Sequence, residues 1–415
     1  MRDTITSLLS SLRGYWKQVS LVALFLFTRT MILYMPPEHS DLPRYWHATL
    51  GPGGQPSLQN LASFEYPPLA FAFVNVPRLF HDTQDTYKRS FRALSLAIDI
   101  LTFGLLACRL SALPLLGYVL GTALLGPVLL DRLDIVLSLC IAIVFFEISA
   151  ARLPRMALLY TVLGIGTAFK IVPAFGLPAL FCYDLSQRGF RRACPGLLVF
   201  LAASGLPMLL AYTFVGTGAF YFLTYHAERG TEAESLWACM QMLGIPLGLE
   251  VSTYFSHGAL NVGSTIESAL AHISLPLLVL SSVLVALPNL SKRTTPRHLW
   301  ASLGLAYTFV LVVNKVLSPQ YFLWWIVATL PSSGPYHRNT ARTVLHVAIA
   351  ALTLWVFPRH FEDLKQLNLI AILPLFLRNG LLVLAAILIL CARGREESTS
   401  ARSHDTPLAA NGERT

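Results

Sequence analysis

Asp41 is the residue whose type and position in this sequence best suit acid–base chemistry. It follows the first long apolar segment, Val19–Met35, and Arg44 and Tyr45 come within about one helical turn of it. A carboxylate at the edge of a membrane segment can act as a general base when a hydroxyl group is presented to it. The other interpretation is structural, because an aspartate just before Leu-Pro can also cap a short helix.

Three cations lie close to the ends of apolar segments. Lys170 follows the apolar run Leu158–Phe169, and Lys315 has a similar place in a later segment. Charged groups inside a membrane are costly and usually face a cavity or a partner, although a lysine can also extend its ammonium to the interface. Arg229, in a polar loop just after His226, adds a third cation. Several cations around one acid suit an anionic lipid headgroup.

Two further motifs contain acidic residues. Glu65 and Tyr66 precede two consecutive prolines, which suit a chain returning to the membrane surface and leave both side chains either structural or directed into a cavity. Asp131 and Asp134 are separated by two residues, a spacing that could suit a metal ion. Because Arg132 lies between them, an internal ion pair is at least as good an interpretation, and we predict neither a metal nor another cofactor.

The composition shows which elements must position these residues. Of the 415 residues, 54% are hydrophobic and 13% are charged, whereas soluble proteins carry about a quarter charged residues. The apolar residues cluster into long segments of the kind that span a bilayer as helices. A soluble enzyme, a disordered chain and a single-pass receptor are therefore excluded. The net charge of +9 comes from short basic loops rather than from a nucleic-acid-binding face, so we expect no nucleic acid partner.

The basic loops predict how the segments are oriented, because arginine and lysine favour the cytoplasmic side. The sequence predicts an all-α polytopic membrane protein of about twelve transmembrane helices with both termini in the cytoplasm. We expect Pro67–Phe80 to lie in the outer interface rather than to cross it. The predicted parts are a cytoplasmic N-terminus (1–18), a transmembrane domain (19–392) with outer loops at about 36–89 and 216–265, and a disordered cytoplasmic tail (393–415).

The polar motifs occur in an order that resembles the polytopic glycosyltransferases of the C superfamily (GT-C). The family that they resemble best is family 87, the polyprenyl-phosphate-mannose-dependent mannosyltransferases, and Asn314–Trp324 also looks like the corresponding stretch of the first GPI mannosyltransferase. The motifs that carry this resemblance are Asp41 after the first helix, Glu65–Leu69, Phe169–Pro173, Arg229 with Glu234-Ser235, and Ser318–Tyr321.

The resemblance implies a mechanism as well as a GT-C fold with its active site at the outer face. Such enzymes transfer a sugar from a polyprenyl-phosphate donor to a lipid or glycolipid acceptor with inversion. Asp41 matches the general base of the first outer loop. The resemblance assigns the donor phosphate to Lys170, Arg229 and Lys315, and the substrate pocket to Arg44, Tyr45, Glu65, Tyr66, His226, Gln320 and Tyr321.

One departure favours family 87 over the GPI branch. Many members of the superfamily have two acids separated by one residue in the first loop, whereas Asp41 has no such neighbour. This departure also weakens the case for a metal. The compact chain and the absence of a retrieval signal at its end suggest a bacterial inner membrane rather than the endoplasmic reticulum.

The alternative function is a transporter or flippase for a lipid-linked or amphiphilic substrate, and a subunit with a decayed catalytic fold is a third possibility. A transporter needs polar groups near the middle of the membrane, whereas the motifs collect at the outer helix ends. Four charged residues are exceptions to this pattern and are either packed pairs, interfacial groups or signs of a transporter. They are Arg29, Asp99, Glu147 and Arg378.

Overall fold

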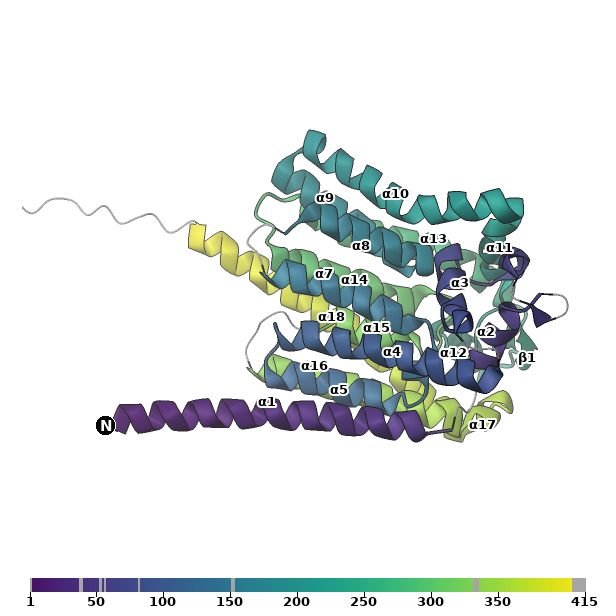
Figure 1. Cartoon of the computed structure of the whole chain (residues 1–415), viewed down its shortest axis with the longest axis horizontal. Coiled ribbons are helices and arrows are strands. Elements are labelled where there is room, and N and C mark those ends of the chain that lie inside the picture. The colour runs from purple at the N-terminus through teal and green to yellow at the C-terminus, as the bar shows by residue number, and fades with distance from the viewer. Residues whose placement is uncertain are drawn as a thin grey trace, which may run out of the picture.

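The computed structural model describes residues 2–36, 40–51, 54–55, 57–80, 83–150, 154–330 and 336–404, and their backbone is mostly helical. The helices of the main bundle run side by side along one direction (Figure 1). They are α1 (Arg2–Tyr34), α4 (Gln84–Ala107), α5 (Ala112–Leu124), α7 (Asp134–Ala150), α8 (Met156–Phe169), α10 (Phe190–Val215), α13 (Glu267–Ala286), α14 (Pro296–Val313), α16 (Tyr336–Leu354) and α18 (Leu369–His404).

Shorter elements connect these helices. The short helices are α2 (Leu42–Ala48), α3 (Pro68–Asn75), α6 (Val128–Asp131), α9 (Leu177–Arg188), α11 (Tyr221–Glu228), α12 (Leu236–Leu243), α15 (Tyr321–Ala328) and α17 (Phe361–Lys365). Two strands, β1 (Ser252–Ser256) and β2 (Ala259–Gly263), pair antiparallel with Ser256 opposite Ala259. The prediction of a purely α-helical chain missed this hairpin.

Five helices in the described part of the chain are long and apolar enough to cross a membrane, so the chain is an integral membrane protein. Four shorter apolar helices accompany them, and the predicted number of about twelve crossings stays a prediction. The five candidate spans are Gln84–Ala107, Phe190–Glu228, Glu267–Leu290, Asn339–Arg359 and Leu369–Arg393, and the shorter helices are Gln18–Tyr34, Ala112–Leu124, Met156–Phe169 and Leu236–Leu247.

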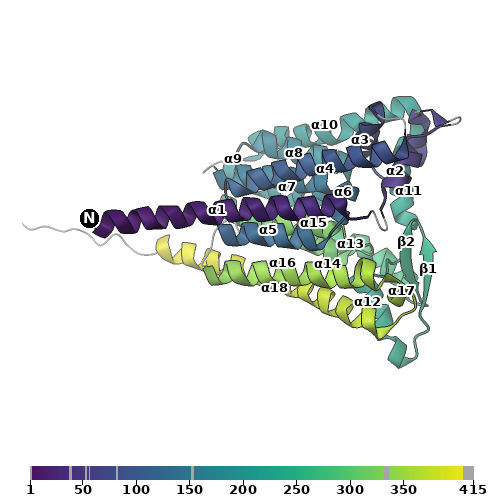
Figure 2. The same ribbon diagram turned by 60° about the horizontal axis from the view of Figure 1, so that its bottom comes forward.

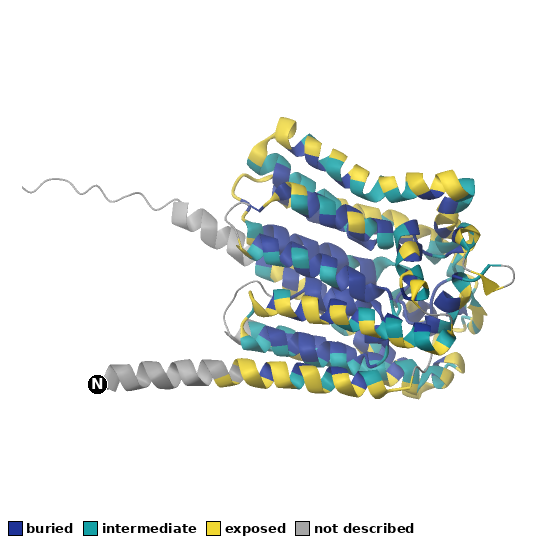
Figure 3. Cartoon of the chain, in the orientation of Figure 1, coloured by how far each residue is buried: buried dark blue, intermediate teal, exposed yellow. Residues whose placement is uncertain are grey.

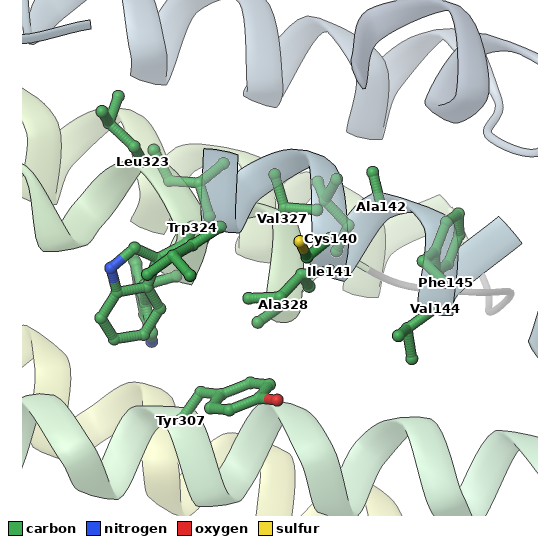
Figure 4. Packing of buried hydrophobic residues seen from close by; sticks show 14 of the residues in the cluster. Cys140, Ile141, Ala142, Val144, Phe145, Tyr307, Leu323, Trp324, Val327 and Ala328 are labelled. Atoms are coloured by element: carbon green, nitrogen blue, oxygen red, sulfur yellow. The ribbon is translucent and has the colours of Figure 1, made fainter. Parts of the chain in front are cut away.

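Helix α7 forms the centre of the bundle because it is apolar on all sides, and such a helix has no face to offer to water. It is almost completely buried, whereas α10 at the edge of the bundle is largely exposed (Figure 3). Cys140 and Phe145 of α7 belong to the same packed cluster as Tyr307 of α14 and Trp324 of α15 (Figure 4). The exposed leucines of α10 are expected to face lipid, because water-exposed apolar stripes of this size are rare.

Helices α8 and α10 approach closely because Gly164 has no side chain. A Cβ atom at this position would lie 2.8 Å from the carbonyl oxygen of Phe200 and 2.7 Å from Cβ of Ala203. Small residues at such contacts let helix backbones pack closely inside membranes. Gly104 of α4 differs, because a Cβ atom there would have no atom within 4 Å.

The short elements α2, α3, α11, β1 and β2 gather at one end of the bundle, which we call the site end (Figures 1 and 2). Helix α1 begins, and helix α18 ends, at the opposite end (Figure 1). The predicted interfacial segment Pro67–Phe80 forms the eight-residue helix α3 and a short 3₁₀ turn, which are too short to cross a bilayer. Helix α18 continues to His404, so the part of the predicted tail before that residue is helical, and residues 405–415 lie outside the described residues.

The four charged residues that the sequence places within apolar segments all form ion pairs. Arg29, Asp99 and Arg378 belong to buried pairs, whereas the partner of Glu147 is 72% exposed. These pairs do not form an open polar pathway, so the transporter interpretation loses support. The pairs are Arg29 with Asp99 at 2.7 Å, Arg155 with Glu147 at 2.7 Å, and Arg378 with Glu234 at 2.5 Å.

Candidate active site

A cavity of about 270 Å³ opens among the short elements at the site end. Its walls come from the start of α2, from the turn before α3, from the loop after α11, from the tip of the β-hairpin and from the segment before α15. Of the residues that the sequence assigns to the site, all but Lys170, Lys315 and Tyr45 line this cavity. The fold therefore brings together motifs that are up to about 280 residues apart in the chain.

Asp41 lies at the N-terminus of α2, but its side chain does not cap the helix. Only its backbone takes part, because the carbonyl oxygen accepts a hydrogen bond from the Tyr45 amide at 2.9 Å. The structural interpretation of Asp41 as a side-chain cap is therefore wrong. The carboxylate forms ion pairs with Arg44, at 2.9 Å, and with Arg132, and the Tyr45 hydroxyl lies 3.4 Å away. Two guanidinium groups thus hold the carboxylate at the cavity wall.

Arg44 connects the first two motifs of the sequence. Its guanidinium contacts Asp41 and lies 2.6 Å from Oε1 of Glu65, so both acids share one cation. Arg44 remains partly exposed, with 41% of its side chain accessible. Glu65 and Tyr66 both line the cavity, and the two prolines after them begin α3. The prolines therefore fix a turn whose preceding side chains face the cavity.

The turn between α6 and α7 distributes its charges among different elements. Arg132 contacts Asp41, and Asp131 pairs with Arg92 of α4 at 2.6 Å. Asp131 therefore has its partner outside the turn, and the interpretation of an internal ion pair is not supported for this residue. In the described residues, no group of three or more His, Cys, Asp or Glu side chains is arranged to hold a metal ion.

Lys170 lies behind the cavity wall rather than on it. Its ammonium contacts both carboxylate oxygens of Asp134, at 2.9 and 3.0 Å, and the Trp324 indole donates to the same carboxylate at 2.9 Å. The rings of Tyr66 and Tyr321, whose centroids lie 5.5 and 4.3 Å from the ammonium, separate it from the cavity. Burial lowers the pKa of Lys170, although the Asp134 carboxylate opposes this effect.

Lys315 also forms its hydrogen bonds with the protein backbone. Its ammonium donates to the carbonyl oxygens of Ala227, at 3.0 Å, and Arg229, at 2.5 Å. A cation at the C-terminal end of α11 satisfies carbonyl groups that the helix leaves unpaired. Lys315 therefore fixes the backbone that carries Arg229.

Arg229 is the member of this predicted trio that reaches the cavity. Its guanidinium lies 3.6 Å from Oε2 of Glu232, and its Nε atom has no hydrogen-bond partner among the described residues. Both side chains are about nine-tenths buried. A buried guanidinium with an unused donor is well suited to a phosphate oxygen.

Glu232 is a site residue that the sequence analysis did not single out, because it lies among other polar residues of a loop. The residue is 8% exposed and lines the cavity. Burial raises the pKa of Glu232 to about 7, and the Glu234 carboxylate adds to this effect, whereas Arg229, Lys170 and Arg132 oppose it. Its spacing of three residues from Arg229 is the feature of the sequence that could have indicated the pair.

The remaining predicted residues take supporting places. Tyr45 is buried behind Asp41 and packs against Phe91, with ring centroids 5.6 Å apart. His226 lines the cavity beside Tyr225, and Gln320 accepts a hydrogen bond from the Ser318 hydroxyl at 2.9 Å. Tyr321 begins α15 and is buried except where it meets the cavity.

The hairpin tip contributes a second missed feature. His257 and Gly258 join the two strands with φ angles of 50° and 69°, which are values that favour a tight two-residue hairpin turn. The Tyr225 hydroxyl donates to the His257 carbonyl at 2.5 Å and so attaches the tip to α11. His-Gly between Thr253–Phe255 and Leu260–Val262 is the sequence pattern that could have predicted this turn.

Comparison with known proteins gives a partial match to a mannosyltransferase. No family model matches the chain. Over 102 residues the chain is 43% identical to GPI mannosyltransferase 1 of Neurospora crassa. The match covers 24% of this chain and 18% of that protein. The relative carries the name of the GPI branch, and the predicted preference for family 87 is not confirmed.

Proposed function

We propose that this protein is a membrane mannosyltransferase that takes a hexose, mannose, from a polyprenyl-phosphate donor and transfers it with inversion to a lipid-linked or glycolipid acceptor. The observation that supports this proposal best is the cavity at the site end, where a fixed carboxylate, Asp41, lies in the same space as the incompletely paired Arg229. The partial match to a mannosyltransferase supports the choice of sugar. Family 87 remains our preferred family because Asp41 has no second acid separated from it by one residue.

In the proposed reaction, the acceptor hydroxyl oxygen attacks the anomeric carbon of the sugar from the face opposite the phosphate. The bond between this carbon and the phosphate oxygen breaks, and the polyprenyl phosphate leaves with the electron pair. Asp41 accepts the hydroxyl proton, as a general base within hydrogen-bond distance can. Arg44 and Arg132 orient the Asp41 carboxylate, and Glu65 and Tyr66 offer polar groups to the sugar.

Arg229 is the residue that we propose to contact the donor phosphate directly. The departing phosphate is already charged, so a fixed cation stabilises it without nucleotide-binding machinery. Lys315 supports this role by holding the Arg229 backbone, and Lys170 contributes a positive charge from behind the tyrosine rings. The sequence assigned the phosphate to all three cations, and the geometry suggests this division between them.

Sugar transfer by purified protein tests the proposal. Liposomes containing the protein receive radiolabelled polyprenyl-phosphate mannose and a membrane lipid extract as acceptor. We expect labelled glycolipid from the wild type and at least a hundredfold less from Asp41→Asn, which keeps the shape of the side chain but removes the base. Asp85→Asn is the matched control, because Asp85 is 83% exposed at the start of α4.

The outcomes separate the parts of the proposal. If Asp41→Asn transfers sugar as fast as the control, Asp41 is not the base, although the enzyme class stands. If the wild type transfers no sugar from this donor to any lipid of the extract, the proposed donor is refuted. Transport of the labelled donor across the bilayer without transfer would favour the flippase alternative.

A further inference from the structure

The Arg229–Glu232 pair differs from the other buried ion pairs of this protein. The other buried pairs are in close contact, and further donors usually satisfy them. Arg229 and Glu232 instead lie 3.6 Å apart, and both Arg229 Nε and Glu232 Oε2 lack a hydrogen-bond partner among the described residues. The closer pairs are Arg29–Asp99 at 2.7 Å, Arg92–Asp131 at 2.6 Å, Lys170–Asp134 at 2.9 Å and Arg378–Glu234 at 2.5 Å.

Such a pair leaves hydrogen-bonding capacity unused. Two buried charges with unpaired polar atoms lose the solvation of water and recover only part of it from each other. Both residues line the cavity, so a ligand there can supply the missing hydrogen-bond partner. Since the unused atom of Arg229 is a donor, the partner that completes it is an acceptor, and an anion would serve best.

The backbone around Glu232 is fixed, so the loose pairing is not a result of a mobile loop. Its amide donates to the Lys315 carbonyl oxygen at 2.9 Å, and the residue forms a β-bridge with Asn261 of β2. These contacts hold the Glu232 backbone in place. Its charge state is the property that can change.

Charged groups from several elements face Glu232. Arg229 and Glu234 come from its own loop, Arg132 from the turn before α7, and Lys170 from the segment after α8. The other titratable side chains that line the same cavity are Asp41, Arg44, Glu65, Tyr66, His226, His257 and Tyr321. The cations near Glu232 include the one that we assign to the donor phosphate, so a bound phosphate and an ionised Glu232 compete for the same positive charge.

We propose that Glu232 is the counter-ion of Arg229, and that it takes up a proton when the phosphate group of a lipid phosphodiester binds to Arg229. This inference rests on the proposed function, because it assumes a phosphate at Arg229. The proton comes from solvent, no covalent bond other than the O–H bond forms, and the charge of the Arg229 environment stays balanced. Release of the phosphate returns the proton and restores the ion pair.

The electrostatics support this exchange. Because burial already raises the pKa of Glu232 to about 7, protonation near neutral pH requires little free energy. A phosphate anion nearby disfavours the ionised carboxylate and raises its pKa further. Binding therefore consumes a proton, and the affinity must fall as the pH rises above 7, by up to tenfold per pH unit.

Calorimetry with a short-chain prenyl methyl phosphate tests this inference. This diester keeps one negative charge throughout the range, so it adds no titration of its own. Titrations at pH 7.5 in two buffers with different heats of ionisation give the number of protons taken up. For the wild type we expect between about one half and one proton per bound diester, a result that depends on no variant.

Two variants locate the proton. Glu232→Gln should take up none, and at pH 8 it should bind the diester about tenfold more tightly than the wild type, with equal affinities at pH 6. Glu228→Gln is the matched control, because Glu228 lies in the same part of the chain with its side chain 72% exposed, and it should behave like the wild type. Dimethyl phosphate, without the prenyl chain, separates a lipid ligand from a free phosphate ester, since a lipid site binds it more weakly with the same proton uptake.

The possible failures are distinguishable. Diester binding without proton uptake, or uptake that persists in Glu232→Gln, overturns the inference about Glu232 and leaves the proposed function intact. If the wild type does not bind the diester, both the phosphate site and the role of Glu232 are refuted.

Discussion

Replacing Lys170 by methionine should destabilise the protein through the aspartate that it leaves behind. The Lys170 ammonium donates to both oxygens of Asp134, and both side chains are buried. In Lys170→Met the carboxylate loses both bonds to the ammonium and keeps the indole of Trp324, at 2.9 Å, as a donor. A buried charge without its ion-pair partner then remains at the start of α7.

The size of the effect follows from this geometry. Breaking a buried ion pair by removing one partner costs about 3–5 kcal/mol, because the remaining charge is still desolvated. If Asp134 is changed to asparagine as well, no charge remains and the Trp324 indole can still donate to the amide oxygen. The double variant should therefore be more stable than Lys170→Met, with a coupling free energy of about 2 kcal/mol or more.

Thermal unfolding in detergent, followed with a thiol-reactive dye, measures these differences. Cys140 is buried in α7 and reacts only when the bundle opens. Lys88→Met is the matched control, because Lys88 pairs at 3.6 Å with an aspartate that is 83% exposed, and such pairs contribute about 0–1 kcal/mol. The midpoint should fall strongly for Lys170→Met, little for the control and by an intermediate amount for the double variant.

Two results would refute this reasoning. The first is a Lys170→Met variant that is as stable as the Lys88→Met control. The second is a double variant whose loss of stability equals the sum of the losses in Lys170→Met and Asp134→Asn, because such a sum would show that the two side chains do not interact. Sugar transfer then separates structure from chemistry. If the double variant recovers stability but not activity, Lys170 has a role in the reaction beyond its support of Asp134.

Two further predictions concern packing and the backbone of the site. Gly164→Val places a side chain against the Phe200 carbonyl and should cost about 1–3 kcal/mol by forcing α8 and α10 apart, whereas Gly104→Val has free space and should change the thermal midpoint less. Equal midpoints for the two variants would contradict the close contact. Lys315→Met removes two hydrogen bonds from a charged donor, each worth about 1.5–3 kcal/mol when fully buried and less at this half-buried position. The variant should raise the KM for the donor more than it lowers kcat, and a change in kcat alone would refute its role in holding Arg229.

The membrane character and much of the cavity could be predicted from the sequence. Apolar segments are recognisable from composition alone, and Asp41, Glu65, Arg229 and Gln320 occur in short motifs whose order indicates a common site. The cavity does contain all four residues. Their roles stay predictions, because a position at the cavity wall does not show what a side chain does in a reaction.

The partners of the charged residues could not be predicted, because they depend on contacts between distant segments. Arg378 and Glu234 are 144 residues apart in the chain, and no local pattern connects them. Glu232 has polar neighbours in the sequence, but strand β2 and the segment before α15 contact its backbone. A single sequence shows the charge of such a loop and not what packs over it.

The turn between α6 and α7 limits how this protein can diverge. Its three charged residues, Asp131 to Asp134, contact α4, the start of α2 and the segment after α8. Loss of one residue there would rotate the side chains by about 100° and disrupt all three contacts together. We therefore expect related proteins to keep this turn unchanged and to differ more readily at the hairpin tip, which the backbone carbonyl of His257 attaches to α11.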